Sequence, residues 1–140
     1  MFSFPPKSAL GPLTSFLVQV EAPSLYLSAR ALELAICESL RSSGLELRQA
    51  QESCDAVLVC EVRQIVTLRT DEGPIALAFS VNMKLLTAVV GYPQSELFCV
   101  WSSHYLGSAT PSLIADLSVK AAEACAKGFV EDLRRPSERP

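Results

Sequence analysis

The most regular feature of the sequence is an alternation of apolar and polar residues in two neighbouring stretches. Between 56 and 69 the even positions are mostly apolar, with Gln64 as the interruption, while the odd positions carry most of the charge. Between 75 and 89 the apolar residues fall on the odd positions. A period of two is typical of a strand with one buried face. The intervening residues 70–74 combine Asp, Gly and Pro and favour a turn, so the two stretches predict a long antiparallel hairpin.

Shorter apolar runs predict the remaining strands. Residues 16–20 form one such run, and residues 45–48 are a further short extended segment. Residues 96–105 follow a Gly-Tyr-Pro turn and predict the strand that pairs next to the hairpin. Residues 107–112 are small and polar, which predicts a loop.

A first helix is predicted from Ser28 to Ser43. A serine favours the N-cap position, and Gly44 lies where a glycine in the left-handed conformation ends a helix. Apolar residues repeat every fourth position along one side of this helix. They are Leu32, Ile36 and Leu40, with Ala35 beside them.

A second helix is predicted from about Ser112 to Arg134. Asp116 near its start and Arg134 at its end both complement the helix dipole. The sequence assigns its buried side to a row of mostly small residues, which allow close packing against a sheet. They are Leu113, Leu117, Ala121, Ala124, Cys125 and Gly128.

The order of these elements is β-α-β-β-β-α, with the short segment at 45–48 as an optional extra strand. A β-α-β crossover makes its strands parallel and the hairpins are antiparallel, so we expect a mixed sheet. The predicted fold class is α+β, a two-layer sandwich of about four strands with both helices on one face. The 140 residues fit one domain at 15–135, with a flexible lead at 1–14 and a frayed tail at 136–140.

Charge and hydrophobicity exclude several classes of protein. The chain has 12 Lys and Arg against 15 Asp and Glu, a net charge of -3, which argues against a dedicated nucleic-acid binder. Hydrophobic residues make up 49% of the chain, which excludes intrinsic disorder. No apolar run reaches the roughly 18–20 residues of a transmembrane segment. The first thirteen residues contain three prolines and do not have the pattern of a secretory signal, so a cytosolic protein and one whose signal has been removed both stay open.

The cysteines and the single histidine do not form a recognisable metal or cofactor site. No Cys-x-x-Cys pair occurs, and the sequence predicts neither a metal centre nor a cofactor. Four of the five cysteines lie in apolar surroundings and are expected to be small buried residues. These four are Cys37, Cys60, Cys99 and Cys125.

Catalysis is not expected. On a regular strand Cys99 and His104 have opposite parity and point to opposite faces, so they do not form a nucleophile–base pair. No phosphate-binding, serine-hydrolase or zinc-protease motif is present. We therefore predict a protein that is not an enzyme and has no catalytic residues.

Cationic side chains on the predicted hairpin are the candidate binding residues. Arg63 and Arg69 share one parity of the first strand, and Lys84 falls on the polar parity of the second. If the hairpin pairs as predicted, all three lie on the face without helices or at its rim, where they can meet phosphate or carboxylate groups of a ligand. The alternative is a solvated sheet face with ordinary Arg and Lys.

Four stretches of the chain resemble one known family. After a strand and a helix come "ESLRSSGLELR" (38–48), "CDAVLVCEV" (54–62), "LRTDEGPIALAFSVNMKLL" (68–86) and "ELFCVWSSHY" (96–105), and an amphipathic helix closes the chain. This order is similar to that of the LptE-like lipopolysaccharide-assembly lipoproteins. The resemblance covers roughly residues 16–134.

The resemblance implies a non-enzymatic lipoprotein on the periplasmic side of the outer membrane, lipid-anchored in its full-length form. Such a protein plugs a β-barrel translocon and contacts lipopolysaccharide through basic residues near the hairpin tip. Arg69 occupies that position here, and Arg63 and Lys84 complete the tentative lipopolysaccharide-binding set. Two alternatives stay open: another envelope lipoprotein, or a cytosolic adaptor, acting purely as a protein–protein interaction module.

Overall fold

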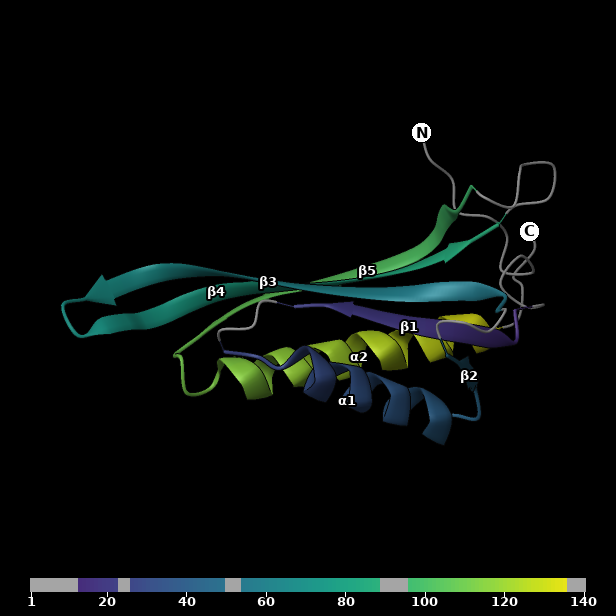
Figure 1. Ribbon diagram of the computed structural model, residues 1–140, viewed down its shortest axis with the longest axis horizontal. Helices are drawn as coiled ribbons and strands as arrows, with labels where there is room; N and C mark the ends of the chain where they lie inside the picture. Colours follow the sequence, from purple (N-terminus) through teal and green to yellow (C-terminus); the bar gives the residue numbers. More distant parts are fainter. Residues whose placement is uncertain (1–12, 23–25, 50–53, 89–95, 136–140) are drawn as a thin grey trace.

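A computed structural model describes residues 13–22, 26–49, 54–88 and 96–135 of the chain. In these residues, five strands form one sheet and two helices pack on one of its faces (Figure 1), so the predicted α+β sandwich is confirmed. The elements are β1 Ser15–Glu21, α1 Ala29–Ser42, β2 Glu46–Arg48, β3 Ala56–Thr70, β4 Gly73–Thr87, β5 Phe98–Ala109 and α2 Ile114–Arg134.

The sheet is mixed, as the sequence predicts. Its strand order is β2-β1-β3-β4-β5, where β1 is parallel to both of its neighbours and the β3–β4 and β4–β5 pairs are antiparallel. The fifth strand is β2, which forms from the short segment after the first helix. The predicted lead and tail at 1–14 and 136–140 fall mostly outside the described residues.

Helix α1 begins and ends where the sequence predicts. The backbone N–H of Ala31 donates to the Ser28 hydroxyl oxygen at 3.2 Å, which caps the first turn. Gly44 has a φ of 86°, the left-handed conformation that glycine adopts without a steric penalty. The predicted stripe faces the sheet, and its three large members are fully buried. They are Leu32, Ile36 and Leu40.

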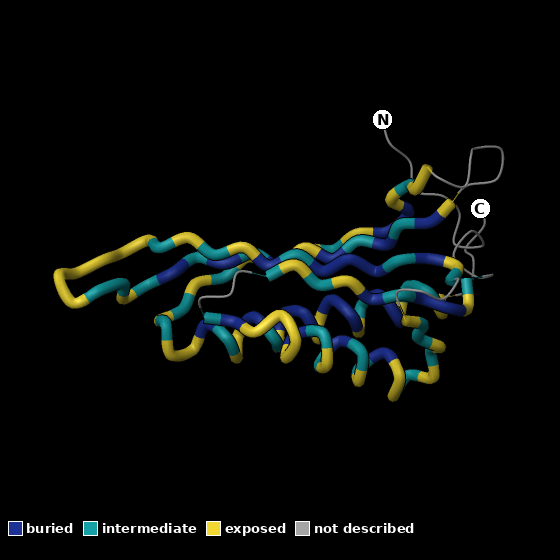
Figure 2. Tube along the Cα trace, in the orientation of Figure 1, coloured by how far each residue is buried: buried dark blue, intermediate teal, exposed yellow. Residues whose placement is uncertain are grey.

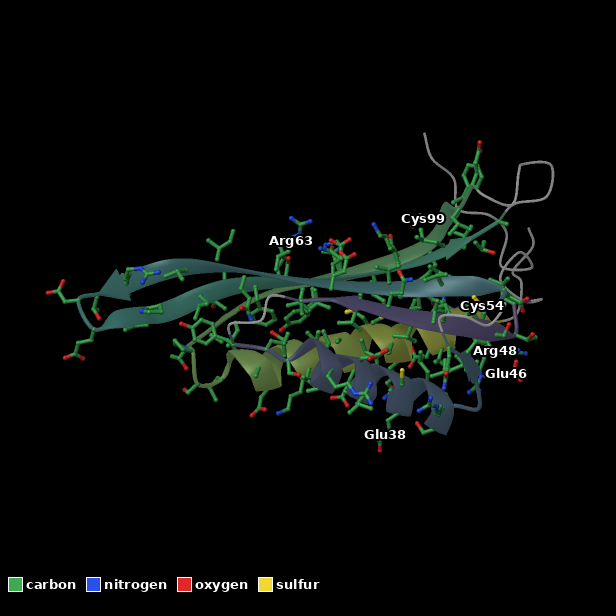
Figure 3. All side chains as sticks on the ribbon, viewed as in Figure 1. Glu38, Glu46, Arg48, Cys54, Arg63 and Cys99 are labelled. Carbon is green, nitrogen blue, oxygen red and sulfur yellow. The ribbon has the colours of Figure 1, made fainter. Side chains whose placement is uncertain are left out.

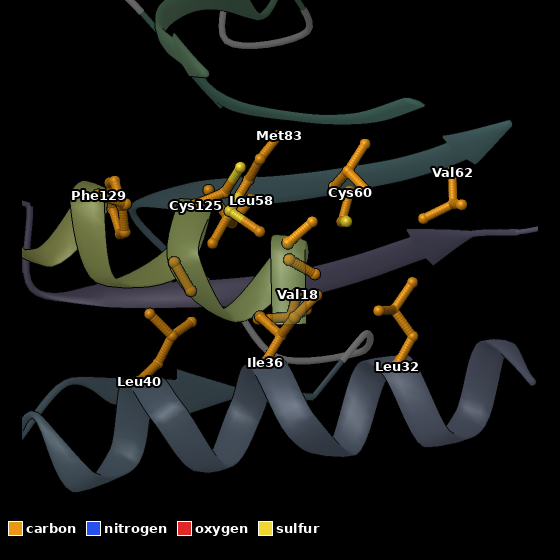
Figure 4. Close-up of a cluster of buried hydrophobic side chains, with 14 of the residues drawn as sticks. Val18, Leu32, Ile36, Leu40, Leu58, Cys60, Val62, Met83, Cys125 and Phe129 are labelled. Atoms are coloured by element: carbon orange, nitrogen blue, oxygen red, sulfur yellow. The ribbon is translucent and has the colours of Figure 1, made fainter. Parts of the chain in front are cut away.

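The core lies between the helices and one face of the sheet (Figure 4). Phe129 of α2 packs edge-on against Phe16 of β1, with ring centroids 5.5 Å apart, and against Trp101 of β5 at 5.1 Å. The Trp101 ring N–H donates to Asp132 at 2.9 Å, so the indole is both buried and hydrogen-bonded. These contacts join the last helix to both the first and the last strand in the chain.

The predicted buried side of α2 is wrong in part. Leu113 and Leu117 are exposed, the former at 52%, while Phe129 and Ile114 are fully buried. Alanines occur around most of this helix, so several stripes have similar apolar character and contact with the sheet selects among them. The buried residues are Ile114, Ser118, Ala121, Ala122, Cys125, Ala126, Phe129 and Val130.

Strand β5 is longer than its sequence indicates. Residues 107–109, predicted as loop, continue the strand, and Ala109 pairs with Leu77 of β4. A side-chain carbon at Gly107 would lie 2.8 Å from the Phe79 ring, which stacks on Tyr105 at a centroid distance of 6.0 Å. Here the glycine makes room for an aromatic pair and does not mark a turn.

The parallel pair β1–β3 is fixed at its start by Asp55. Its carboxylate accepts the backbone N–H of Thr14 at 2.7 Å and that of Ser15 at 3.2 Å. These hydrogen bonds, that of Thr14 first, hold the pKa of Asp55 below its ordinary value. The backbone N–H of Asp55 donates in turn to the Ser15 carbonyl oxygen at 3.0 Å, which sets the register of the two strands.

Two leucines of α1 test which side of this helix stabilises the fold. Leu32→Ala should lower the free energy of unfolding by about 2–5 kcal/mol, because it leaves a cavity beneath the sheet. Leu34→Ala makes the same chemical change at a side chain that is 52% exposed and should change that free energy by no more than about 0.5 kcal/mol. Urea denaturation measures both, and equal losses in the two variants would contradict the assigned core.

Candidate ligand-binding surface

The face of the sheet away from α1 and α2, here the helix-free face, brings two of the three predicted cations together. Arg63 of β3 and Lys84 of β4 both approach Glu61, which lies between them. One guanidinium nitrogen of Arg63 is 3.3 Å from Oε2 of Glu61, and Nζ of Lys84 is 3.5 Å from Oε1. Figure 3 shows Arg63 projecting from the sheet on the side opposite the helices.

The three charged groups form a cluster with one net positive charge. The hydrogen bond from Arg63, together with the charge and hydrogen bond of Lys84, holds the pKa of the Glu61 carboxyl below its ordinary value. The Arg63 side chain is 76% exposed, so its remaining donors face solvent. The cluster therefore keeps cationic donors available to an anionic ligand, although half of its positive charge is compensated.

Polar residues of the two neighbouring strands complete this surface. A shallow depression of about 300 Å³ adjoins the charge cluster. Beyond the cluster it is lined by Asn82, Met83, Ser102, Ser103 and His104. The sequence analysis did not assign Glu61 or His104 to the site. The hairpin register could have indicated Glu61, because it places Glu61 opposite Asn82, on the same face as Arg63 and Lys84.

Arg69 lies apart from this cluster. It pairs with Pro74 next to the hairpin turn, six positions and roughly 20 Å along β3 from Arg63. The register shifts twice between Val66 and Arg69, so parity no longer places the two arginines on one face. The structure thus separates the predicted set into a pair on the helix-free face and a single arginine at the tip.

The end of the hairpin carries apolar residues together with one cation, Arg69, and two acidic turn residues, Asp71 and Glu72. Glu61 is the last residue of β3 that pairs with β1. The nine residues of β3 after it pair with β4 only, and β5 pairs with the other side of β4 over part of this length. We call residues 62–81 the hairpin arm; its end extends past the helices and is exposed (Figures 1 and 2). Exposed apolar side chains near Arg69 are Ile65, Leu68 and Ile75.

The predicted separation of Cys99 and His104 onto opposite faces is wrong. A register shift between Leu85 and Leu86 brings Cys99 opposite Leu86, while His104 pairs with Asn82, so both fall on the helix-free face. They are still five positions apart, about 16 Å along the strand, and the Cys99 thiol donates to the Trp101 carbonyl at 3.3 Å. The two do not form a catalytic pair.

The cysteines are free thiols, and the prediction that four are buried holds for only two of them. Cys60 and Cys125 are buried, and burial raises the pKa of Cys60 to about 12. Cys37 is half-buried, and Cys99 is exposed because the register shift turns it toward the open face.

Across the described segments, no three Cys, His, Asp or Glu residues are grouped as metal ligands. Neither α1 nor α2 has the length and apolar character of a membrane-spanning helix.

No protein-family model and no curated protein matches the sequence. Among solved structures, the PelC dodecamer from Paraburkholderia phytofirmans matches with 18% identity over 96% of both chains and a TM-score of 0.54. The hypothetical protein CT253 from Chlamydia trachomatis matches with 8% identity, 87% and 98% coverage and a TM-score of 0.54. A minor lipoprotein from Acinetobacter baumannii matches with 14% identity, 91% and 98% coverage and a TM-score of 0.48. At these identities the first two matches show a shared fold alone, and the TM-score of the third is too low to show even that.

The compensation of charge at Glu61 predicts a titration result. Arg63→Ala and Lys84→Ala should each raise the pKa of the Glu61 carboxyl toward its ordinary value, because each removes a cation that stabilises the carboxylate. Carbon-detected NMR of the Glu61 side chain during a pH titration measures the change. Lys120→Ala, on the outer side of α2, is the control and should leave this pKa unchanged. An unchanged pKa in both test variants would refute the cluster.

Proposed function

We propose that this protein is a non-enzymatic accessory component of lipopolysaccharide transport and outer-membrane assembly. In this role it binds a β-barrel translocon from the periplasmic side and contacts lipopolysaccharide. The observation that carries the proposal is the hairpin arm, which presents Arg69 beside exposed apolar side chains beyond the cover of the helices.

The arm combines the two kinds of contact that a glycolipid requires. An arginine binds phosphate groups with paired, charged hydrogen bonds. Leu68 and Ile75 supply apolar surface near Arg69, where acyl chains can pack. Exposed apolar side chains that gather on a protruding element are typical of an interaction site.

The charge cluster on the helix-free face supplies a second cationic contact. Arg63 and Lys84 keep one net positive charge after Glu61 is counted. A ligand with phosphates at two places can therefore meet Arg69 at the tip and the cluster farther along the same hairpin.

The rest of the domain fits a binding role in a wet environment. The helix-free face has a polar centre around Glu61, Asn82 and Ser102, which suits contact with the water-filled interior of a large barrel. The proposed location is the periplasmic side of the outer membrane, through a lipid anchor on the full-length protein, and a cytosolic adaptor is the alternative. Detection of the protein in outer-membrane or soluble fractions separates the two.

A charge reversal at the tip tests lipopolysaccharide binding. Arg69→Glu should weaken binding of purified lipopolysaccharide by roughly ten- to a hundredfold, since a hydrogen bond to a charged group contributes about 1.5–3 kcal/mol. Its Tm should stay nearly unchanged, because Arg69 is exposed. Lys120→Glu changes the net charge equally on α2 and should bind like the parent protein. Equal binding by the Arg69 variant and the parent would remove Arg69 from the site.

A second candidate function is that of a subunit in a homo-oligomer that acts through protein–protein contacts. The observation that favours it is the match over 96% of the chain to a protein crystallised as a dodecamer. A shared fold does not transfer the assembly, so this candidate needs its own test.

The mass of the protein in solution provides that test. If the chain self-associates, light scattering coupled to size exclusion should give a mass of two or more protomers that rises with concentration. A mass of one protomer across the micromolar range would exclude this candidate while leaving the lipopolysaccharide proposal standing.

A further inference from the structure

The sheet leaves strand edges unpaired at three places within the described residues, and two of them are protected. The edge formed by β2 and the end of β1 is short, and Glu46 and Arg48 form an ion pair there at 2.6 Å. The edge of β3 beyond Glu61 carries Arg63 and Arg69 and is irregular between them. Short length, charged side chains and bulges are the means by which native sheets prevent further strand pairing.

The outer edge of β5 lacks these protections over most of its length. Its twelve residues contain no Asp, Glu, Lys, Arg or Pro, and its register shift lies at one end, near Cys99. Leu106 is 72% exposed and Tyr105 is also exposed, so apolar side chains stand on both faces of the strand next to this edge. A long, uncharged, partly apolar edge is a template for another strand.

We propose that β5 is the interface through which two copies of this chain pair, antiparallel, about a two-fold axis at His104. Such an axis opposes residues of the two copies whose numbers add to 208. Tyr105 then lies across from Ser103 of the second copy, and Leu106 across from Ser102. Gly107 lies across from Trp101, so each large side chain meets a small one along the central part of the strand.

Charge also favours a second copy as the occupant of this edge. Pairing β5 with itself brings no formal charges together, because the strand has none. The free edge of β3 instead carries Arg63 and Arg69, with an irregular register between them, which disfavours a regular pairing with a second copy. An antiparallel two-fold pairing in the plane of the sheet keeps the helices of both copies on one side, and it leaves the hairpin arm and the Arg63–Lys84 cluster exposed.

This inference rests on the self-association candidate and assigns its contact surface. The test uses the full chain and places a charge on the axis. His104→Lys and His104→Glu should each weaken the dimer at least tenfold, because two like charges then meet across the axis. His104 is exposed, so neither change should alter the secondary structure of the protomer, which far-UV circular dichroism measures. An equimolar mixture of the two variants should restore the dimer, since opposite charges then face each other.

Ile65→Lys is the matched control, because it places the same charge on the exposed edge of β3 and should leave the dimer intact. If the parent protein associates but the His104 variants do so equally well, the β5 interface is wrong and the self-association candidate stands. If each variant dissociates and the mixture does not recover, the two-fold pairing is wrong. A parent protein that stays monomeric overturns the β5 interface and the self-association candidate together.

Discussion

The fold depends on burying one face of the sheet and leaving the other open. Alternate residues of β1, β3 and β4 enter the layer beneath α1 and α2, where Phe129 contacts side chains from the first and last strands. Two helices cover one face of the sheet except at the end of the hairpin arm, and none of the described elements covers the other face. The residues between the buried positions must therefore tolerate water, and they are available for contacts outside the chain.

The same constraint explains where charge can gather. Glu61, Arg63 and Lys84 occupy the open face, where solvent and mutual pairing stabilise all three charges. The shared carboxylate keeps two cations close together, and it reduces the field that a ligand meets. Arg69 forms no ion pair with another described residue; it is exposed near the tip, with the turn residues Asp71 and Glu72 after it and apolar side chains close by. The proposed lipopolysaccharide contact therefore combines a single arginine at the tip with a partly compensated pair on the sheet.

The hairpin arm and the outer edge of β5 are separate features with separate proposed partners. The arm projects beyond the helices and offers side chains, whereas β5 offers an outer edge that no other described strand pairs with along residues 99–109. Pairing through β5 would extend the sheet and would not cover the arm. Self-association and ligand binding are thus compatible in one assembly, with the arms of both copies accessible.

The sequence by itself determined the elements that depend on local pattern. Period-two alternation identified β3 and β4, and Ser28, Gly44 and the Leu32 stripe located α1, because these signals act within a few residues of one another. It also placed Arg63 and Lys84 on the open face, since parity and a hairpin turn fix which residues are neighbours.

Only the tertiary structure decided the features that depend on contacts between distant segments. The many alanines of α2 permit several packings, so contacts with Phe16 and Trp101 select its buried side. These two residues lie more than a hundred and nearly thirty positions, respectively, before Phe129, the α2 residue that they contact. Register shifts turned Cys99 to the open face and separated Arg69 from Arg63, and simple parity assumes an unbroken ladder. Gly107 lies within β5 opposite Phe79, whose ring would clash with any side chain at position 107. This steric requirement arises only when β4 and β5 pair.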